Sequence, residues 1–246
     1  MDNAIYVGLS RQMLLERELD ITANNLANVD TVGYKFDELL NAADPVTTSA
    51  PGGQPSTITF VTSDGVARDY TQGALTQTGS PLDVAIDGKG FFQISTASGT
   101  RYTRDGRFRL DATGKLVTQD GDAVQGDGGD ITLDPKKGAV AISSNGEISQ
   151  SGQVVGKLAV VSFDSLSALS KDGANLYRND SNLTEQPATS ATLKQGMLEG
   201  SNVQPITQIT RLIEINQAYN AVSIMMSSTA SLSNAAIQRL GAVNPS

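Results

Sequence analysis

The last forty residues of the chain constrain its fold more than any other stretch. From Val203 to Leu240 there is no glycine, and the only proline, Pro205, lies in the first turn. Apolar and small residues recur there at alternating spacings of three and four, which places them on one stripe of a helix. The stripe consists of Leu212, Ile215, Tyr219, Val222, Met226, Thr229, Ala236 and Leu240. Such a helix is about 55 Å long at roughly 1.5 Å per residue, so it needs a partner that covers the stripe.

The same helix is poor in charge. It carries only Arg211, Glu214 and Arg239, whereas a helix that faces solvent usually has many charged residues on its outer side. A second apolar row consists of Ile206, Ile209 and Ile213. One interpretation is a helix buried in a monomeric bundle, but the chain contains only one other good helix, which cannot surround this one. The composition therefore favours packing against other subunits on several sides.

The second helix is predicted over residues 3–28, with an approximate apolar stripe along Ile5, Leu9, Leu15, Leu19, Ala23 and Leu26. Glu16, Arg17, Glu18 and Asp20 indicate an exposed face around its middle turns. Asn28 and Gly33 mark the helix end and a turn, because asparagine and glycine are favoured there. Asn24 and Asn25 lie a full turn inside the helix, where asparagine is unfavourable. Simple fraying would explain them, but we favour side-chain hydrogen bonds to another segment.

The residues between the helices form a turn-rich β region. Asp-Gly occurs at 64, 87, 105, 120, 127 and 172, and Asn-Gly at 145, which are strong signals for tight turns. Residues 36–79 read as a connecting, extended linker with short strands, one of them at 57–62. Residues 80–195 read as a β-rich outer domain, and residues 196–202 as a return linker. Strands are expected at 84–86, 90–95, 115–118, 123–125, 130–133, 139–143, 146–149 and 155–163.

The predicted fold is therefore a mainly β central domain plus long N- and C-terminal α-helices that form a coiled-coil-like pair. Residues 1–35 and 203–246 make up this terminal assembly domain. The residues expected to pack between helices or subunits are Ile5, Leu9, Leu15, Leu19, Leu26, Asn24, Asn25, Asn28, Gly33, Leu212, Ile215, Tyr219, Val222, Met226 and Leu240.

An arginine cluster lies in residues 101–110, which look like a hairpin turning at Asp105 and Gly106. In that arrangement Arg104, Arg107 and Arg109 share one face, because side chains alternate along strands. This face is either simply solvated or contacts an acidic surface, most simply another copy of this acidic chain.

Composition excludes several functions. The chain has 246 residues, a formal net charge of -8, no cysteine and no histidine. The charge argues against nucleic acid or an anionic membrane surface as the main partner. The missing histidines exclude Ser-His-Asp and Cys-His catalysis and the commonest transition-metal ligand. No stretch approaches the ~20 apolar residues of a membrane span, and residues 1–20 lack the basic start of a secretory signal. We therefore expect export without signal cleavage if the protein works outside the cytoplasm.

No motif predicts a catalytic, cofactor or metal site. The acidic run at 120–130 fails as an EF-hand, because Val124 and Gln125 stand where a ligand and a glycine are required. An enzyme without histidine, such as a peptidoglycan hydrolase, and a binding module with a pocket in the β region remain as alternatives.

Four blocks of sequence resemble the bacterial flagellar rod, hook and hook-associated axial proteins. They are residues 23–28 with Thr31 and Gly33-Tyr34-Lys35, residues 73–92, residues 102–106 with Phe108, and residues 196–203. The match runs over nearly the whole chain in the right order. Two departures are residues 216–220, where relatives often carry Arg and Glu around the aromatic residue, and Asp30, where Asn is common.

The resemblance implies a structural subunit of the periplasmic drive shaft of the flagellar basal body. The opening residues 1–6 and the modest length are most similar to subunits of the proximal rod, with a distal-rod or hook-type subunit as the alternative. Copies would stack helically, with terminal helices inside and β domains outside, around a hollow core. The implied partners are further copies, other rod proteins and the flagellar type III export apparatus. The resemblance implies no cofactor, nucleic acid or membrane insertion.

Overall fold

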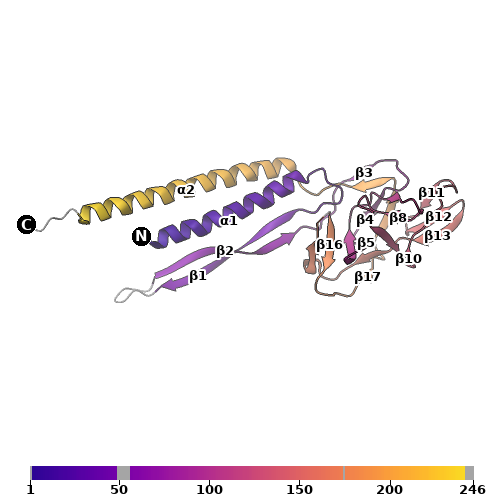
Figure 1. The fold of residues 1–246 in the computed structure, drawn as a ribbon, viewed down its shortest axis with the longest axis horizontal. Coiled ribbons are helices and arrows are strands. Elements are labelled where there is room, and N and C mark those ends of the chain that lie inside the picture. The colour runs from indigo at the N-terminus through magenta and orange to yellow at the C-terminus, as the bar shows by residue number, and fades with distance from the viewer. Residues whose placement is uncertain (1, 49–55, 174, 242–246) are drawn as a thin grey trace, which may run out of the picture. The chain divides into compact units, whose positions relative to one another are not determined.

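The computed structural model describes residues 2–48, 56–173 and 175–241 (Figure 1). These residues fall into two compact units. The helical unit comprises residues 2–27, 37–69 and 204–241, and the β unit comprises residues 28–36 and 70–203, each range with the gaps just given. The N-terminal helix, the mainly β central region and the C-terminal helix are thereby confirmed.

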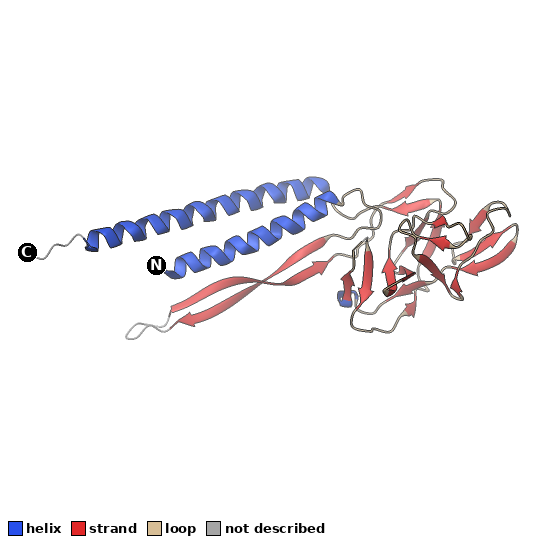
Figure 2. Cartoon of the chain, viewed as in Figure 1, coloured by secondary structure: helices blue, strands red, loops and turns tan. Residues whose placement is uncertain are grey.

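Both terminal helices lie in the helical unit. The N-terminal helix α1 spans Asp2–Ala27, and the C-terminal helix α2 spans Pro205–Gly241. Pro205 is the first residue of α2, where its missing N–H would have no partner within the helix in any case. No glycine interrupts α2 before Gly241. Figure 2 shows α1 and α2 side by side, with a long β-hairpin running along α1.

That hairpin consists of β1 (Asp37–Thr48) and β2 (Ser56–Arg68), which pair antiparallel. The strands are 12 and 13 residues long, where the sequence had indicated a linker with short strands. Composition misled here because two paired strands satisfy each other's backbone groups, whatever their polarity. Pro45 fits the pairing because each strand of a two-stranded sheet has an unpaired edge.

α1 is covered on two sides, by α2 and by the hairpin, and its buried face is correspondingly wide. Adjacent Leu14 and Leu15 are both buried. Glu18, expected on the exposed face, is buried as well; it lies where both partners meet α1. Asn25 is 1% exposed and bonds the backbone of Asp37 twice: its Nδ2 donates to the carbonyl at 2.7 Å, and its Oδ1 accepts from the N–H at 3.0 Å. The predicted bond from Asn25 to another segment is confirmed.

The β unit contains short antiparallel strands and one 3₁₀ turn, η1 (Leu166–Ala168). Its strands are β3 (Leu75–Gln77), β4 (Val84–Asp87), β5 (Phe91–Thr96), β6 (Gly99–Thr103), β7 (Arg109–Leu110), β8 (Leu116–Val117), β9 (Ala123–Gly126), β10 (Gly129–Asp130), β11 (Val140–Ile142), β12 (Glu147–Gln150), β13 (Gln153–Lys157), β14 (Val160–Ser162), β15 (Leu169–Lys171), β16 (Leu176–Asn179), β17 (Gln186–Pro187), β18 (Thr192–Gln195) and β19 (Met197–Glu199). The expected strand at 155–163 is thus two strands, and the expected return linker at 196–202 contains β19.

One sheet of ten strands dominates the β unit, in the order β15-β16-β6-β5-β9-β8-β7 with β10, β14 and β17 attached at its sides. Two apolar cores lie against it. Phe92 belongs to the larger core, where its ring meets Phe108 edge-on at 5.0 Å, and Phe91 belongs to the smaller core around Tyr177. Because neighbouring residues of a strand point to opposite faces, β5 anchors both cores.

The hairpin expected at residues 101–110 is wrong. β6 pairs with β5 and β16, whereas β7 pairs with β8. A two-residue hairpin turn of the Asp-Gly type requires a positive φ at the glycine, but the φ of Gly106 is not positive. Gly106 is needed for another reason: a Cβ there would lie 1.7 Å from the carbonyl oxygen of Val84. The glycine permits a close crossing of two segments and does not turn the chain.

We therefore expect Gly106→Ala to destabilise the β unit by about 3 kcal/mol, as overpacking of a core does. Urea unfolding followed by tyrosine fluorescence measures this effect. Gly128→Ala is the matched control, since a Cβ at Gly128 meets nothing within 4 Å, and its effect should stay within about 0.5 kcal/mol. Equal stability of the two variants would contradict the close crossing.

Candidate functional site

The contact between α1 and α2 is made by one face of each helix. On α2, Ile215 is 2% exposed, and Leu212, Tyr219, Val222 and Met226 are half-buried. The side chain of Leu240 lies outside the described residues. On α1 the approach is close at Gly8, where a Cβ would lie 2.8 Å from Cγ of Met226. The contact thus includes Met226 of the α2 stripe predicted from the sequence.

The residues predicted on the N-terminal side have different environments. Leu15 and Asn25 are buried in the helical unit, whereas Leu9 and Asn24 are exposed. The half-buried members are Ile5, Leu19, Leu26 and Asn28, and Gly33 is buried in the β unit. The approximate stripe therefore did not separate the buried from the exposed positions of α1, since two partners cover this helix from different sides.

Exposed apolar side chains concentrate in the helical unit. Of the fourteen large apolar residues that are exposed in the described chain, only Val154 and Val155 belong to the β unit. The α2 members are Ile206, Ile209, Ile213, Ile224, Met225, Leu232 and Ile237, and the α1 members are Tyr6, Leu9 and Met13. Ile206 and Ile224 are each nine residues from Ile215, which places them about 180° around the helix from the α1 contact. We call Ile206, Ile209, Ile213 and Ile224, which all lie about 120° or more around the helix from Ile215, the outer apolar face.

The β unit contains a buried charge cluster made of Lys35, Arg104 and Glu199. Their exposed fractions are 0%, 4% and 1%. Nζ of Lys35 lies 2.5 Å from Oε1 of Glu199, and Nη1 of Arg104 lies 3.0 Å from Oε2. Each cation thus pairs with a different oxygen of the same carboxylate.

Backbone groups complete the polar environment of the cluster. Lys35 also donates to the carbonyl of Thr71 at 2.6 Å, and Arg104 donates through Nη2 to the carbonyl of Gly88 at 2.8 Å. The N–H of Gly73 donates to Oε1 of Glu199 at 3.0 Å. Burial lowers the pKa of Arg104, and the negative charge of Glu199 opposes that shift. Such bonds are what make buried charges tolerable.

Further hydrogen bonds join the segments next to Lys35 and Glu199. The N–H of Gly33 donates to the carbonyl of Glu199 at 2.7 Å, and the N–H of Phe36 donates to Oδ1 of Asn202 at 2.8 Å. Gly33 has a φ of +70°, and a Cβ there would lie 2.6 Å from the backbone of Arg104. Gly33 was predicted as a turn residue, and it also permits this contact.

The arginine cluster predicted from the sequence is divided by the structure. Arg104 is inside the β unit and is not a surface residue, because its segment crosses the sheet and does not form the expected hairpin. Arg107 pairs with Asp105 at 2.6 Å, and Arg109 is exposed. Contact with another subunit therefore stays a prediction for Arg107 and Arg109 alone. Lys35 and Glu199 escaped sequence reasoning, although each is the charged residue of a block that carries the family resemblance.

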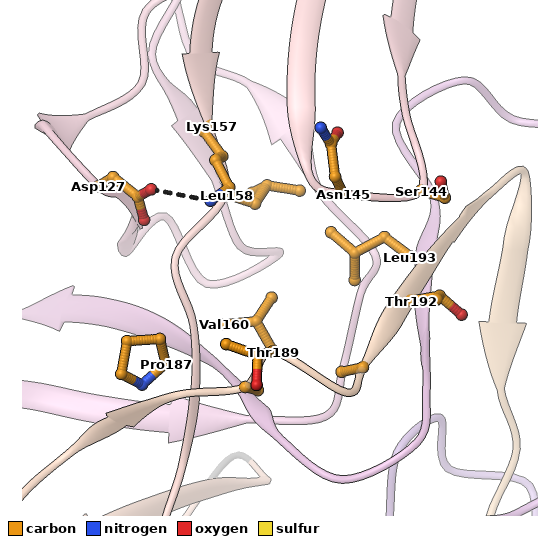
Figure 3. Close-up of a pocket in the computed structure, with 12 residues that line it drawn as sticks. Asp127, Ser144, Asn145, Lys157, Leu158, Val160, Pro187, Thr189, Thr192 and Leu193 are labelled. Carbon is orange, nitrogen blue, oxygen red and sulfur yellow. Dashed lines mark ion pairs between the residues drawn. The ribbon is translucent and has the colours of Figure 1, made fainter.

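A cavity of about 650 Å³ opens in the β unit beside residues 187–193 (Figure 3). Leu158, Val160 and Leu193 line it, and Asp127 pairs with Lys157 at 3.2 Å near its edge. Both charged side chains are about half exposed, and the lining presents no nucleophile paired with a base. Among the described residues there is no group of three acidic side chains arranged to hold a metal ion. No helix in the described ranges is long and apolar enough to cross a membrane.

Family models match three separate parts of the chain. A model described as "Flagella basal body rod protein" matches residues 5–35, "Flagellar hook protein FlgE/F/G D1 domain" matches residues 85–150, and "Flagellar basal body rod FlgEFG protein C-terminal" matches residues 194–239. Each matched part contributes one member of the charge cluster: Lys35, Arg104 and Glu199.

Relatives that match nearly the full length of the chain are also flagellar basal-body rod proteins. The chain is 51% identical to flagellar basal-body rod protein FlgF of Caulobacter vibrioides over 99% of its own length and 100% of the relative. It is 36% identical to FlgF of Mesorhizobium japonicum over 98% and 99% of the two chains. FlgG of Bacillus subtilis is 34% identical over 91% of this chain and 93% of its own.

Replacing Glu199 by glutamine tests the energetic role of the cluster. The substitution leaves Lys35 and Arg104 buried without their counter-charge, which should cost about 3–5 kcal/mol of unfolding free energy. Urea unfolding of the full chain measures it. Asp87→Asn is the matched control, because it removes an exposed pair with Lys194 at 2.7 Å and should cost no more than about 1 kcal/mol. A Glu199→Gln variant as stable as Asp87→Asn would contradict the assignment.

Proposed function

Because this chain belongs to the FlgF family of flagellar basal-body rod proteins, we propose that it is a structural subunit of the rod and is held to other subunits through α1 and α2. The observation that carries the proposal is the outer apolar face of α2. Its four members are between 47% and 80% exposed, and the chain's own α1 contacts the opposite side of the helix.

Covering that face requires other subunits. Apolar surface removed from water contributes roughly 25 cal/mol per Å², and twelve of the fourteen large apolar residues that are exposed in the described part of the chain lie in the helical unit. The β unit has buried its own two cores and exposes few such residues. We therefore assign assembly to the helical unit, and an outward position in the rod to the β unit.

In the rod, copies of the chain stack helically with the terminal helices toward the axis, where α1 and α2 form a coiled-coil-like pair. The stack encloses a hollow core and transmits torque across the periplasm. Other rod proteins adjoin the stack at its ends, and the chain reaches this location through the flagellar type III apparatus without signal cleavage. The packing residues on both helices and the exposed Arg107 and Arg109 are assigned to these contacts.

This role requires no catalysis. The chain has no histidine, and the charged residues at the cavity of the β unit, Asp127 and Lys157, are paired with each other. No arrangement among the described residues favours the hydrolase or the small-molecule binding module over the rod subunit.

Ile213→Asp should block incorporation into rods, because it would place an unpaired charge in an apolar interface at a cost of several kcal/mol. The fold of the free chain should be preserved, since Ile213 is 50% exposed. Purified basal bodies, probed for the chain, measure incorporation, and circular dichroism measures folding. Val154→Asp is the matched control at an exposed valine of the β unit, and it should incorporate normally. Normal incorporation of Ile213→Asp would show that the outer apolar face is not an interface.

The proximal part of the rod is the position that similarity to FlgF favours, with the FlgG-like distal part as the alternative. Electron microscopy of basal bodies from a strain lacking this chain separates the two positions. We expect rods that stop before the proximal part is complete, because distal subunits would have nothing to stack on. A rod that lacks only its distal part would favour the alternative, and an intact rod would refute both.

A further inference from the structure

Glu18 is the one buried charged residue among the described side chains of the helical unit, whose other buried polar residues, Thr22, Asn25 and Gln208, are uncharged. It is 8% exposed on α1. Its Oε1 accepts from Nδ2 of Asn41 on β1 at 3.1 Å, and Nη2 of Arg211 on α2 lies 3.5 Å from each of its oxygens. Three elements of the helical unit therefore meet at one carboxyl group, and neither the proposed assembly contacts nor the charge cluster of the β unit uses it.

The repeating apolar stripe does not by itself fix the register of the helices. α2 has 37 residues and α1 has 26, so α2 extends about three turns beyond the length of α1. An apolar stripe with three-four spacing offers similar surfaces to a partner that slides by one turn, because the same spacing recurs along it. A polar group at a single buried position is the usual way in which paired helices fix one register.

The positions of the charged residues on α2 make the pairing of Glu18 specific to one register. Sliding α2 by one turn in one direction brings Glu214 or Ile215 toward Glu18, which opposes it with a like charge or leaves it without a charged partner. Sliding in the other direction brings Gln208 or Thr207. The other arginine of α2, Arg239, is 28 residues away from Arg211, or about 42 Å along the helix. Only one register therefore gives Glu18 its cation.

We propose that Glu18, held by Asn41 and paired with Arg211, is the positioning residue that sets the register of α2 against α1. The inference stands on contacts within one chain and does not depend on the assembly proposed above. In a shaft of stacked copies its consequence is that every subunit presents the outer apolar face at the same height.

Disulfide trapping tests the register directly, because the chain has no cysteine of its own. The G8C/M226C pair reports the register of the structure, in which these positions touch. The G8C/V222C and G8C/A230C pairs report α2 displaced by one turn in either direction. Each pair is placed in the full-length chain and oxidised both in the purified protein and in isolated basal bodies, and the yields are compared by mass spectrometry of peptides.

Glu18→Leu should lower the ratio of native to displaced cross-links by roughly tenfold, which corresponds to a preference of about 1.4 kcal/mol. Glu16→Leu, at an exposed glutamate of the same helix, should leave the ratio unchanged. The double variant Glu18→Arg with Arg211→Glu should restore the ratio that Glu18→Arg alone loses, since it re-forms the pair with reversed charges. An unchanged ratio in Glu18→Leu overturns the proposal. If Glu18→Leu does not fold, failure of the double variant to restore the native cross-link overturns it.

Discussion

One carboxylate without access to solvent, that of Glu199, is the group on which the β unit depends. Lys35 and Arg104 each donate a hydrogen bond to one of its oxygens. The carbonyls of Thr71 and Gly88 accept further hydrogen bonds from the two cations. Each family model that matches the chain includes one of the three charged residues. A buried ion cluster contributes less to stability than an apolar core of the same volume would, but the loss of one member strands the others. Its effect is therefore to specify which segments meet.

Those segments are the ones through which the chain passes between its units. The chain passes at residues 27–28, 36–37, 69–70 and 203–204. Three of the adjoining segments, residues 33–36, 71–73 and 199–202, are bonded to one another within the β unit. The β unit thus buries its two apolar cores and hydrogen-bonds the segments that connect it to the helical unit. Most of the large apolar residues that are exposed in the described part of the chain belong to the helical unit. The proposed function thus assigns stability within one subunit to the β unit and association between subunits to the helical unit.

Local signals predicted the parts of the fold that local forces determine. Helix periodicity, Pro205 in the first turn and the absence of glycine from Val203 to Leu240 identified α2, and Asn25 inside a helix correctly indicated a bond to another segment. The failures have a tertiary cause. Gly106 looks like a turn residue in the sequence, but the oxygen of Val84 is the reason for it, and Glu18 looks exposed because Asn41 and Arg211 are distant in the chain. The pairing of β1 with β2 depends on backbone bonds that composition does not encode.

The sequence separation within the charge cluster also bears on how the β unit folds. Lys35 and Glu199 are 164 residues apart, so their contact belongs to the class of long-range closures that give a fold a high contact order and slow its formation. The entropic cost of closing such a loop rises only with the logarithm of its length, but it must be met before the ion pairs form. The bonds of Lys35 to Glu199 and of Phe36 to Asn202 therefore cannot form until the chain has been synthesised through residue 202.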